Sequence, residues 1–348
     1  MPELMPAVRK IRPRRGLEMT EIPRPEIGSH EVLVEVKATS ICGTDRQIYE
    51  WTPWARHRCG SKIPFTQGHE LCGEIVEVGS SVRERRTGQF VSAESHIVDY
   101  QGEYFRRGLA HVAPETRIIG VDRDGAFARY IALPWQNTRP NPSDMPLKVA
   151  VLKENFGNAI HVGYAVDVSG LDVLITGAGP VGLMTLLIVR ALGARTILIS
   201  DVSRYRLDFA LRLGADEVIN PKQDDLVEKV RDLSPRSGVD VLLEMSGAPS
   251  AVLGGLDLLR AGGHAVAFGL PEDPLTLELS DLIIFKGITL HGIVGRRLWD
   301  TWEKMESLLR EGLVDLSPIV THQYPLADFD KAFETMEAGQ CGKVMMRP

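Results

Sequence analysis

One short segment, Gly177-Ala178-Gly179-Pro180-Val181-Gly182, constrains the fold of this chain more than any other. It follows an apolar run at residues 172–176 and opens a second apolar run that ends near residue 191. Small residues let the backbone turn tightly and approach a pyrophosphate, and free N–H groups at a helix N-terminus favour its negative charge. The segment therefore predicts a strand, a phosphate-binding turn and a helix.

The next apolar run, residues 196–200, ends in Asp201. A carboxylate at this place accepts hydrogen bonds from both hydroxyls of an adenosine ribose and repels a 2′-phosphate. This combination of strand, turn, helix and acid favours NAD over NADP as the ligand. Arg204 and Arg206, which follow the acid, leave NADP as an alternative. The competing interpretation is a structural glycine turn followed by a surface aspartate.

The pattern of apolar residues, Gly and Pro changes near residue 150. Before it, short β-branched runs such as residues 31–36 and 73–79 are punctuated by Gly and Pro, which predicts an irregular all-β domain. After it, strand and helix patterns alternate, which predicts a doubly wound parallel sheet and an α/β fold class. In the last fifty residues, helical patterns at 298–311 and 328–339 flank a strand pattern at 319–324, and we expect this tail to pack onto the first domain.

Composition excludes several function classes. The 348 residues carry a formal charge of −6, so the basic footprint of a nucleic-acid binder is missing. The longest uncharged stretch, residues 173–189, contains three glycines and a proline, so we expect no membrane span. The N-terminus has an early acid and no apolar run, which predicts a cytoplasmic protein with small-molecule partners.

A second group of residues has the chemistry of a metal site. Cys42-Gly43-Thr44-Asp45 is followed, 27 residues after Cys42, by His69 within Gly68-His69-Glu70. Thiolate, imidazole and carboxylate are typical zinc ligands, and three protein ligands with one open position make a catalytic site. Taken singly, each residue is more often a core residue. Their occurrence together with a nucleotide fold favours zinc.

These residues resemble the zinc-dependent medium-chain alcohol dehydrogenases, and within that family the L-threonine 3-dehydrogenase branch. The resemblance covers nearly the whole chain. The zinc and nucleotide motifs are those of the whole family, whereas three segments are typical of the threonine branch: Phe156-Gly157-Asn158-Ala159, Glu244-Met245-Ser246-Gly247 and Leu316-Ser317-Pro318.

The resemblance implies a GroES-like, β-rich catalytic domain made of residues 1–151 and 298–348, with a Rossmann NAD-binding domain, residues 152–297, between them. It implies one catalytic zinc per subunit and a homotetramer. Carried over residue by residue, the metal ligands are Cys42, His69, Glu70 and Glu154, and Thr44 supplies the hydroxyl of a proton relay. The implied cofactor residues are Gly177, Gly179, Pro180, Val181, Gly182, Asp201, Arg206, Phe268, Gly269, Leu270, Ile293 and Val294.

Two departures from the family pattern concern the catalytic residues. Gln47 stands where the threonine branch has a histidine that continues the relay from Thr44. An amide cannot titrate near pH 7, so Gln47 can orient a water but cannot accept the proton. Lys153 precedes the metal-facing Glu154, where it either pairs with that acid or points to solvent.

A third departure concerns a second metal. Relatives carry four cysteines in the loop that corresponds to residues 96–114, and these bind a structural zinc. The matching positions here are Asp99, Gly102, Phe105 and Ala113, so we expect no structural zinc. Either an apolar cluster holds this lobe together, or the loop is loosely ordered. The residues available for such a cluster are Tyr100, Tyr104, Phe105, Leu109 and Val112.

Three functions remain open from the sequence. The first is oxidation of L-threonine to 2-amino-3-oxobutanoate with hydride transfer to NAD, with Thr44, Glu154 and Gln47 at the catalytic centre. The second is a related dehydrogenase that acts on a polyol, a sugar or 2,3-butanediol, for which Gln47 and the altered lobe are adaptations. The third is an NAD-binding protein with impaired catalysis. Substrate preference distinguishes the first two, and bound zinc without hydride transfer would indicate the third.

Overall fold

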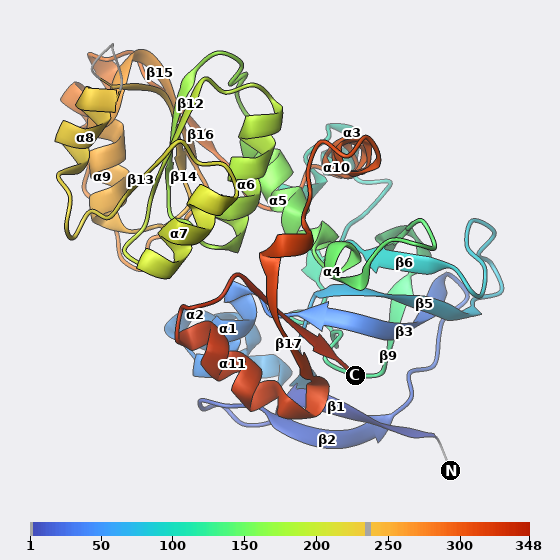
Figure 1. The fold of residues 1–348 in the computed structure, drawn as a ribbon. Coiled ribbons are helices and arrows are strands. Elements are labelled where there is room, and N and C mark those ends of the chain that lie inside the picture. The colour runs from blue at the N-terminus through green and yellow to red at the C-terminus, as the bar shows by residue number, and fades with distance from the viewer. Residues whose placement is uncertain (1–2, 234–237) are drawn as a thin grey trace. The chain divides into compact units, whose positions relative to one another are not determined.

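The computed structural model describes residues 3–233 and 238–348, which form two compact units (Figure 1). Unit 1 contains residues 1–155 and 316–348, and unit 2 contains residues 156–315. The resemblance places residues 298–315 in the catalytic domain, whereas the structure groups them with unit 2. The helix at residues 300–310 lies against the helix at residues 153–163, since an added Cβ at Gly157 would lie 3.5 Å from Met305 Cε.

Unit 1 is built on a seven-stranded sheet in which the C-terminal strand pairs with a strand from the first forty residues. Its strand order is β10-β6-β5-β3-β18-β17, with β9 also paired to β3. The C-terminal strand β18 is antiparallel to β3, with Met345 opposite Ser40. The sheet strands are β3 (Glu31–Ser40), β5 (Glu70–Val78), β6 (Phe90–Ala93), β9 (Tyr130–Pro134), β10 (Thr138–Pro140), β17 (Val320–Pro325) and β18 (Lys343–Arg347).

Smaller elements surround this sheet. A three-stranded sheet has the order β2-β1-β4, and a two-stranded ladder joins β7 to β8. The strands are β1 (Leu4–Lys10), β2 (Glu18–Pro23), β4 (Phe65–Thr66), β7 (His96–Ile97) and β8 (Arg117–Ile118). The helices are α1 (Gly43–Glu50), α2 (Pro53–Cys59), α3 (Glu103–Arg106), α4 (Leu147–Ala150) and α11 (Phe329–Glu337).

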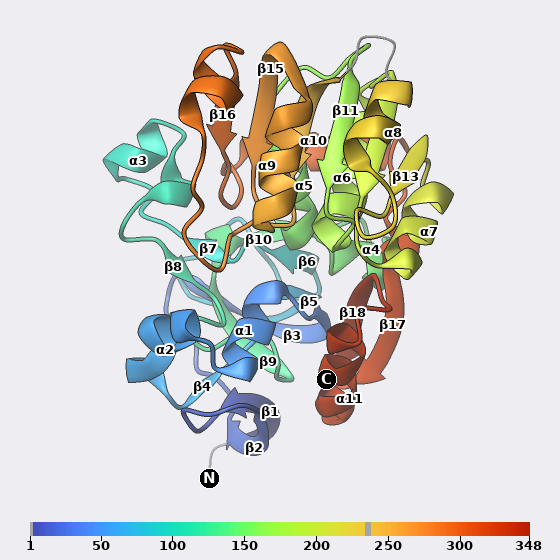
Figure 2. The same ribbon diagram turned by 90° about the vertical axis from the view of Figure 1, so that its left-hand side faces the viewer.

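Unit 2 is a doubly wound parallel sheet, as predicted. Its order is β13-β12-β11-β14-β15-β16, and every neighbouring pair is parallel. This is the 3-2-1-4-5-6 order of the dinucleotide-binding fold. The strands are β11 (Asp172–Thr176), β12 (Thr196–Ser200), β13 (Glu217–Ile219), β14 (Val239–Glu244), β15 (Leu259–Ala267) and β16 (Thr289–Gly292). Figure 2 shows β16 at one edge of this sheet.

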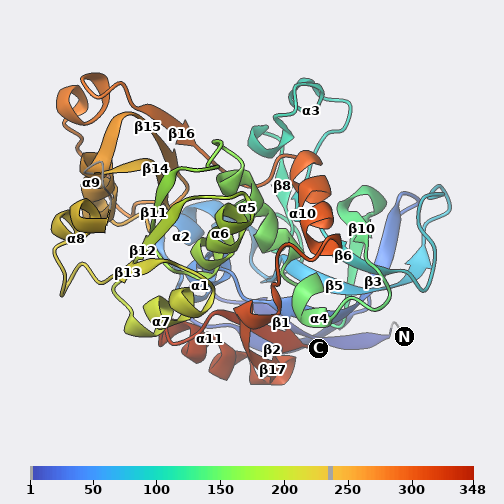
Figure 3. The same ribbon diagram turned by 45° about the horizontal axis from the view of Figure 1, so that its top comes forward.

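Helices cover both faces of the parallel sheet (Figure 3). Helices α8 and α9 lie on one face, and α5, α6 and α7 lie on the other. The helices are α5 (Lys153–Gly163), α6 (Pro180–Ala191), α7 (Arg204–Arg212), α8 (Leu226–Leu233), α9 (Pro249–Leu258) and α10 (Asp300–Arg310). No helix in the described ranges is long and apolar enough to cross a membrane.

Helix α6 begins later than the sequence pattern indicates. The apolar run opens at Gly177, but the helix begins at Pro180 with Gly179 as its N-cap. Proline is favoured at the first helical position because the N–H of that residue makes no hydrogen bond within a helix, so its absence removes no bond. The residues before it are therefore left to form the turn.

A buried charge network holds the amino end of the parallel sheet. The Asp172 carboxylate is 1% exposed and accepts two hydrogen bonds from Arg195, at 2.8 and 2.7 Å, and one from Arg260 Nη2 at 2.8 Å. Arg260 also pairs with Asp240. Burial alone would raise the pKa of Asp172, but hydrogen bonds from the two arginines lower it far below its usual value.

We expect Asp172→Asn to lower the free energy of unfolding by about 2–4 kcal/mol, because it removes the buried negative charge that Arg195 and Arg260 share and leaves Asp240 as the acid beside Arg260. A lowered carboxyl pKa stabilises the fold at pH values above the unfolded-state pKa of about 4, and this contribution is lost as pH falls further. Denaturant unfolding from pH 3 to pH 7 measures both effects. Asp208→Asn, in the exposed Arg204–Asp208 pair, is the control and should cost about 0.5 kcal/mol or less.

Candidate functional site

The pairing of β3 with β5 assembles the predicted metal ligands in unit 1. Ser40, the last residue of β3, lies opposite Glu70, the first residue of β5. Cys42 lies two residues after the end of β3, and His69 immediately precedes β5. Ligand atoms of Cys42, His69 and Glu70 all lie within 4.8 Å of one another, and no other group of this kind occurs in residues 3–233 and 238–348.

Asp45 connects two members of this cluster. Its Oδ2 accepts a hydrogen bond from the backbone N–H of Cys42 at 2.9 Å, which caps helix α1. Its Oδ1 lies 3.6 Å from His69 Nδ1. Burial lowers the pKa of His69, but the negative charges of Asp45 and Cys42 outweigh burial and raise it well above its ordinary value.

Glu70 is held by two further side chains. Its Oε1 accepts a hydrogen bond from Lys343 Nζ at 2.5 Å, and its Oε2 accepts one from the Ser40 hydroxyl. Lys343 Nζ also donates to the Ile41 carbonyl at 3.0 Å. Burial raises the pKa of Glu70, and Lys343 opposes this shift while the charge of Glu154 adds to it.

Neither Lys343 nor Ser40 is among the residues predicted from the sequence. One signal for Lys343 exists, because it is the single charged residue in the apolar run Lys343-Val344-Met345-Met346. A lysine that begins a buried strand needs an anionic partner, since an unpaired buried charge is costly. The sequence does not say which acid that partner is.

The fourth predicted ligand, Glu154, lies at the start of α5. It is 3% exposed, and its Oε1 accepts a hydrogen bond from the Ser95 hydroxyl at 2.6 Å. Its charge acts on both Glu70 and Lys343, although its carboxylate is not part of the group within 4.8 Å. The structure thus brings Glu154 near the cluster without joining it to the three closest ligands.

The relay residues share one helix. Thr44 and Gln47 are three positions apart on α1, so they lie on the same helical face, and both are half-buried. Lys153 is 1% exposed, and its Nζ donates to Asn141 Oδ1 at 3.0 Å. The interpretation in which Lys153 points to solvent is therefore wrong, because its side chain is buried and bonds the Asn141 amide.

This cluster suits a zinc ion. It offers a thiolate, an imidazole and carboxylates in a buried site, which are the donors that zinc takes in proteins. The Asp45 carboxylate lies against the imidazole as well, and both Asp45 Oδ1 and His69 Nδ1 are buried without a hydrogen-bond partner among the described residues. A cation at this place would balance the thiolate and carboxylate charges.

The loop at residues 96–114, where the resemblance predicts no structural zinc, is held by aromatic and backbone contacts. The rings of Tyr100 and Phe105 pack edge to face with centroids 5.0 Å apart. Asp99 Oδ1 accepts the backbone N–H of Gln101 at 2.9 Å, and Gly102 is the N-cap of α3. Ala113 donates its N–H to the Ala110 carbonyl at 3.2 Å. The residues at the four positions that correspond to cysteines thus form an aromatic contact and local turns.

In unit 2, the glycine-rich turn leaves the N-terminus of α6 open. Gly177 has φ +98, and an added Cβ at Gly182 would lie 2.0 Å from the Gly177 carbonyl oxygen, so both positions require glycine. An added Cβ at Gly179 would meet nothing within 4 Å, and no side chain caps the helix. The N–H groups of the first turn are thus available to an anion such as a pyrophosphate. Pro180 and Val181 complete this turn.

Asp201 is held in place beside this turn. Its Oδ2 accepts the N–H of Ala178 at 2.9 Å, and its Oδ1 accepts the N–H of Ser203 at 2.8 Å. Arg206 Nη1 lies 3.6 Å from the carboxylate, and Arg206 Nε is buried without a hydrogen-bond partner among the described residues. These residues fit the adenosine end of a dinucleotide, because the fixed carboxylate retains further acceptor capacity.

The residues predicted at the nicotinamide end follow β15 and β16. Phe268 and Gly269 donate their N–H groups to the Glu244 carbonyl at 2.9 and 3.0 Å, and Leu270 is 80% exposed. Ile293 N–H bonds the Ala267 carbonyl at 2.9 Å, and Val294 is 51% exposed.

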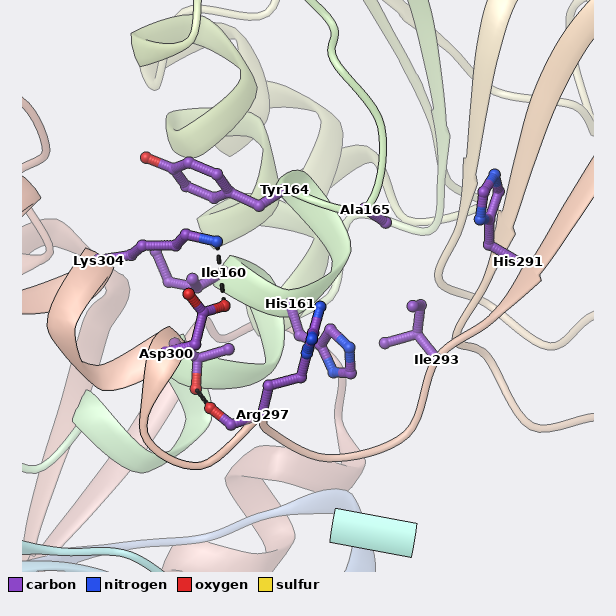
Figure 4. A pocket seen from close by; sticks show the side chains of 10 residues that line it. Ile160, His161, Tyr164, Ala165, His291, Ile293, Arg297, Asp300 and Lys304 are labelled. Atoms are coloured by element: carbon purple, nitrogen blue, oxygen red, sulfur yellow. Dashed lines mark hydrogen bonds and ion pairs between the residues drawn. The ribbon is translucent and has the colours of Figure 1, made fainter. Parts of the chain in front are cut away.

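A cavity of about 200 Å³ lies between α5, β16 and α10 (Figure 4). Among the predicted cofactor residues, Ile293 alone lines it, beside His161, His291 and Arg297. The glycine turn and Asp201 do not contribute to its lining. This cavity is therefore separate from the glycine turn and from Asp201.

Comparisons with known proteins agree across the whole chain. Residues 28–143 match the family described as alcohol dehydrogenase GroES-like domain, and residues 180–311 match zinc-binding dehydrogenase. The chain is 45% identical to the L-threonine 3-dehydrogenase of Symbiobacterium thermophilum over 100% of this chain and 99% of that protein. It is also 45% identical to the L-threonine 3-dehydrogenase of Pyrococcus horikoshii over 99% of each chain. The crystal structure of 2R,3R-butanediol dehydrogenase from Bacillus subtilis superposes with a TM-score of 0.88 at 25% identity, covering 99% of each chain.

We expect the purified protein to contain one zinc per chain and Cys42→Ala to contain close to none, because Cys42 supplies the only thiolate of the cluster. Elemental analysis after dialysis measures this content. Cys59→Ala, which alters a buried thiol outside the cluster, should retain one zinc. Two zinc ions per chain in the unaltered protein would contradict the prediction that residues 96–114 hold no structural zinc.

Proposed function

Because this chain belongs to the family of zinc-binding alcohol dehydrogenases, we propose that it oxidises the 3-hydroxyl of L-threonine to give 2-amino-3-oxobutanoate, with NAD⁺ as hydride acceptor. The observation that carries this proposal is the buried Cys42, His69 and Glu70 cluster in a chain that resembles threonine dehydrogenases from end to end. The cluster accounts for alcohol chemistry, and the full-length similarity supports the amino-acid substrate.

Cys42 and His69 would hold the zinc ion together with an acid from Glu70 or Glu154. A bound zinc supplies Lewis acidity, which lowers the pKa of an alcohol toward neutrality. Asp45 orients His69 and caps α1, so both ligands keep their positions. Lys343 and Ser40 each bond one oxygen of Glu70, and this restrains how far its carboxylate can move toward the cation.

Thr44 Oγ1 would accept the proton released by the substrate hydroxyl and pass it on. Gln47, on the same face of α1, can hold a water molecule in line but cannot itself take up the proton. The proton therefore leaves through water rather than through an imidazole. This arrangement supports turnover that is slower than in an enzyme with a titrating base at the same place.

The cofactor preference follows from Asp201. NAD⁺ supplies the carbon that accepts the hydride. The open N-terminus of α6 would bind its pyrophosphate, and the Asp201 carboxylate would accept the ribose hydroxyls. A 2′-phosphate would face this fixed negative charge, which supports NAD over NADP.

A second candidate substrate is a polyol, a sugar or 2,3-butanediol. Two observations favour it: Gln47 replaces the relay histidine, and the lobe at residues 96–114 lacks its metal ligands. The structural similarity to 2R,3R-butanediol dehydrogenase also supports this substrate class, at a sequence identity of 25%. An NAD-binding protein with impaired catalysis is the remaining alternative, because Gln47 cannot titrate.

We also propose that the chain forms a homo-oligomer, a tetramer by resemblance, through the edge of the parallel sheet. Strand β16 ends the sheet, so its outer backbone groups have no neighbouring strand among the described residues. Large apolar side chains are exposed beside it, including Leu290 at 51%, Ile284 at 60% and Phe285 at 80%. An exposed apolar edge of this kind is normally covered by another chain.

We expect zinc-loaded protein to form NADH from NAD⁺ and L-threonine at a higher kcat/KM than from 2,3-butanediol or sorbitol.

Gln47→His should raise kcat, up to about 10²-fold, and add an imidazole titration to the pH profile. Arg46→His, on the exposed side of α1, should do neither. Activity on a diol or polyol with none on threonine would favour the second substrate class, and zinc binding without any turnover would favour impaired catalysis.

Light scattering should give a molar mass that is a multiple of 38.4 kDa for the unaltered chain. Leu290→Lys places a charge on the apolar edge and should reduce that mass. Leu211→Lys, at a comparably exposed leucine of α7, should leave it unchanged. A monomeric unaltered protein would refute the proposed assembly.

A further inference from the structure

Glu244 is the last residue of β14 and is only 2% exposed, yet no cation among the described residues pairs with it. Its Oε1 accepts four hydrogen bonds: from the Thr176 hydroxyl at 3.2 Å, from the N–H of Ser246 at 2.9 Å, from the Ser246 hydroxyl at 2.5 Å and from the N–H of Gly247 at 3.0 Å. Its Oε2 lies 3.2 Å from the same Gly247 N–H. The carboxylate is therefore satisfied entirely by neutral donors.

These donors belong to two separate loops at the carboxyl edge of the sheet. Thr176 ends β11 directly before the glycine turn, and Ser246 and Gly247 follow β14. The register of the sheet places Thr176 beside Glu244 and Glu244 beside Ala267. One side chain thus links two neighbouring loops of the edge where dinucleotides bind in this fold.

The loop after β15 is tied to the same residue. The Glu244 carbonyl accepts the N–H groups of Phe268 and Gly269. An added Cβ at Gly269 would lie 2.6 Å from Glu244 Oε2 and 2.1 Å from the Gly247 nitrogen. An added Cβ at Gly177 would lie 3.0 Å from the Ser246 nitrogen. The three loops therefore pack closely around the carboxylate, and glycine is required where they touch.

A carboxylate suits this place for a specific reason. It offers only acceptor sites, and hydrogen bonds to an ionised acceptor are stronger than those between neutral groups. An amide that kept its oxygen at the Oε1 position would turn its NH₂ group toward the Gly247 N–H, and its neutral oxygen would accept weaker hydrogen bonds from the other donors. A shorter acid could not reach the same donors without moving the loops.

We propose that Glu244 is a positioning residue of the dinucleotide site, which holds the three loops in their binding conformation before the cofactor arrives. The proposal rests on the proposed use of NAD, because the loops it ties carry the glycine turn and the residues Phe268 and Gly269. Glu244 does not itself contact the cofactor. It reduces the ordering cost that binding would otherwise have to meet.

Asp172 provides a matched control, because it is equally buried and hydrogen-bonded but lies at the opposite, amino end of the same sheet. We expect Glu244→Gln to raise the Kd of NADH, measured by fluorescence titration well below the melting temperature, by about tenfold, equivalent to about 1.4 kcal/mol. The KM for NAD⁺ should rise in parallel while kcat changes much less. Asp172→Asn should lower the melting temperature at least as much and leave the Kd of NADH unchanged.

Two further measurements test the proposal if Glu244→Gln does not fold. Glu244→Asp keeps the charge and should bind NADH more weakly than the unaltered protein. In the unaltered protein without cofactor, the Ser246 and Gly247 amides should exchange slowly with deuterium.

Different results overturn different statements. Equal NADH affinity for Glu244→Gln and the unaltered chain, or fast exchange of both amides before NADH is added, would overturn the positioning role. Failure of the unaltered, zinc-loaded chain to bind NADH at all would instead overturn the proposed cofactor.

Discussion

The ion pair between Glu70 and Lys343 is the interaction on which unit 1 depends. Both side chains are 3% exposed or less, and they join residues 273 positions apart in the chain. Removing one partner would leave an uncompensated buried charge, which is strongly destabilising. The C-terminal strand therefore has to return to β3 and β5, and in doing so it completes the surroundings of the metal ligands.

The same pair influences the chemistry of the cluster. Lys343 lies against the carboxylate that also faces Cys42 and His69, and it donates to the carbonyl next to Cys42. A metal in this cluster would share Glu70 with a lysine and a serine. Such sharing restrains a flexible acid, and Lys343 also acts on the charge of Cys42.

In unit 2, two buried acids serve opposite ends of one sheet. Asp172 neutralises arginines at the amino end, where no ligand is expected, so its contribution is to stability. Glu244 is surrounded by neutral donors from loops at the carboxyl end, where the dinucleotide would bind. The ion pairs of Asp172 remain possible when the exposed side chain of Arg195 moves. The hydrogen bonds of Glu244 require the backbone of the surrounding loops to keep one conformation.

The sequence by itself determined what short-range pattern can encode. The glycine turn with Asp201 and the strands at 172–176 and 196–200 follow from local spacing and apolar runs. The Cys42, His69 and Glu70 set follows from ligand chemistry beside a nucleotide-binding pattern. The tertiary structure decided which distant residues complete these sites, such as Lys343 beside Glu70, Ser95 beside Glu154 and Asn141 beside Lys153. The physical reason is that a buried polar group must find a partner, but periodicity along the chain carries no information on which strand register or loop will bring that partner into contact.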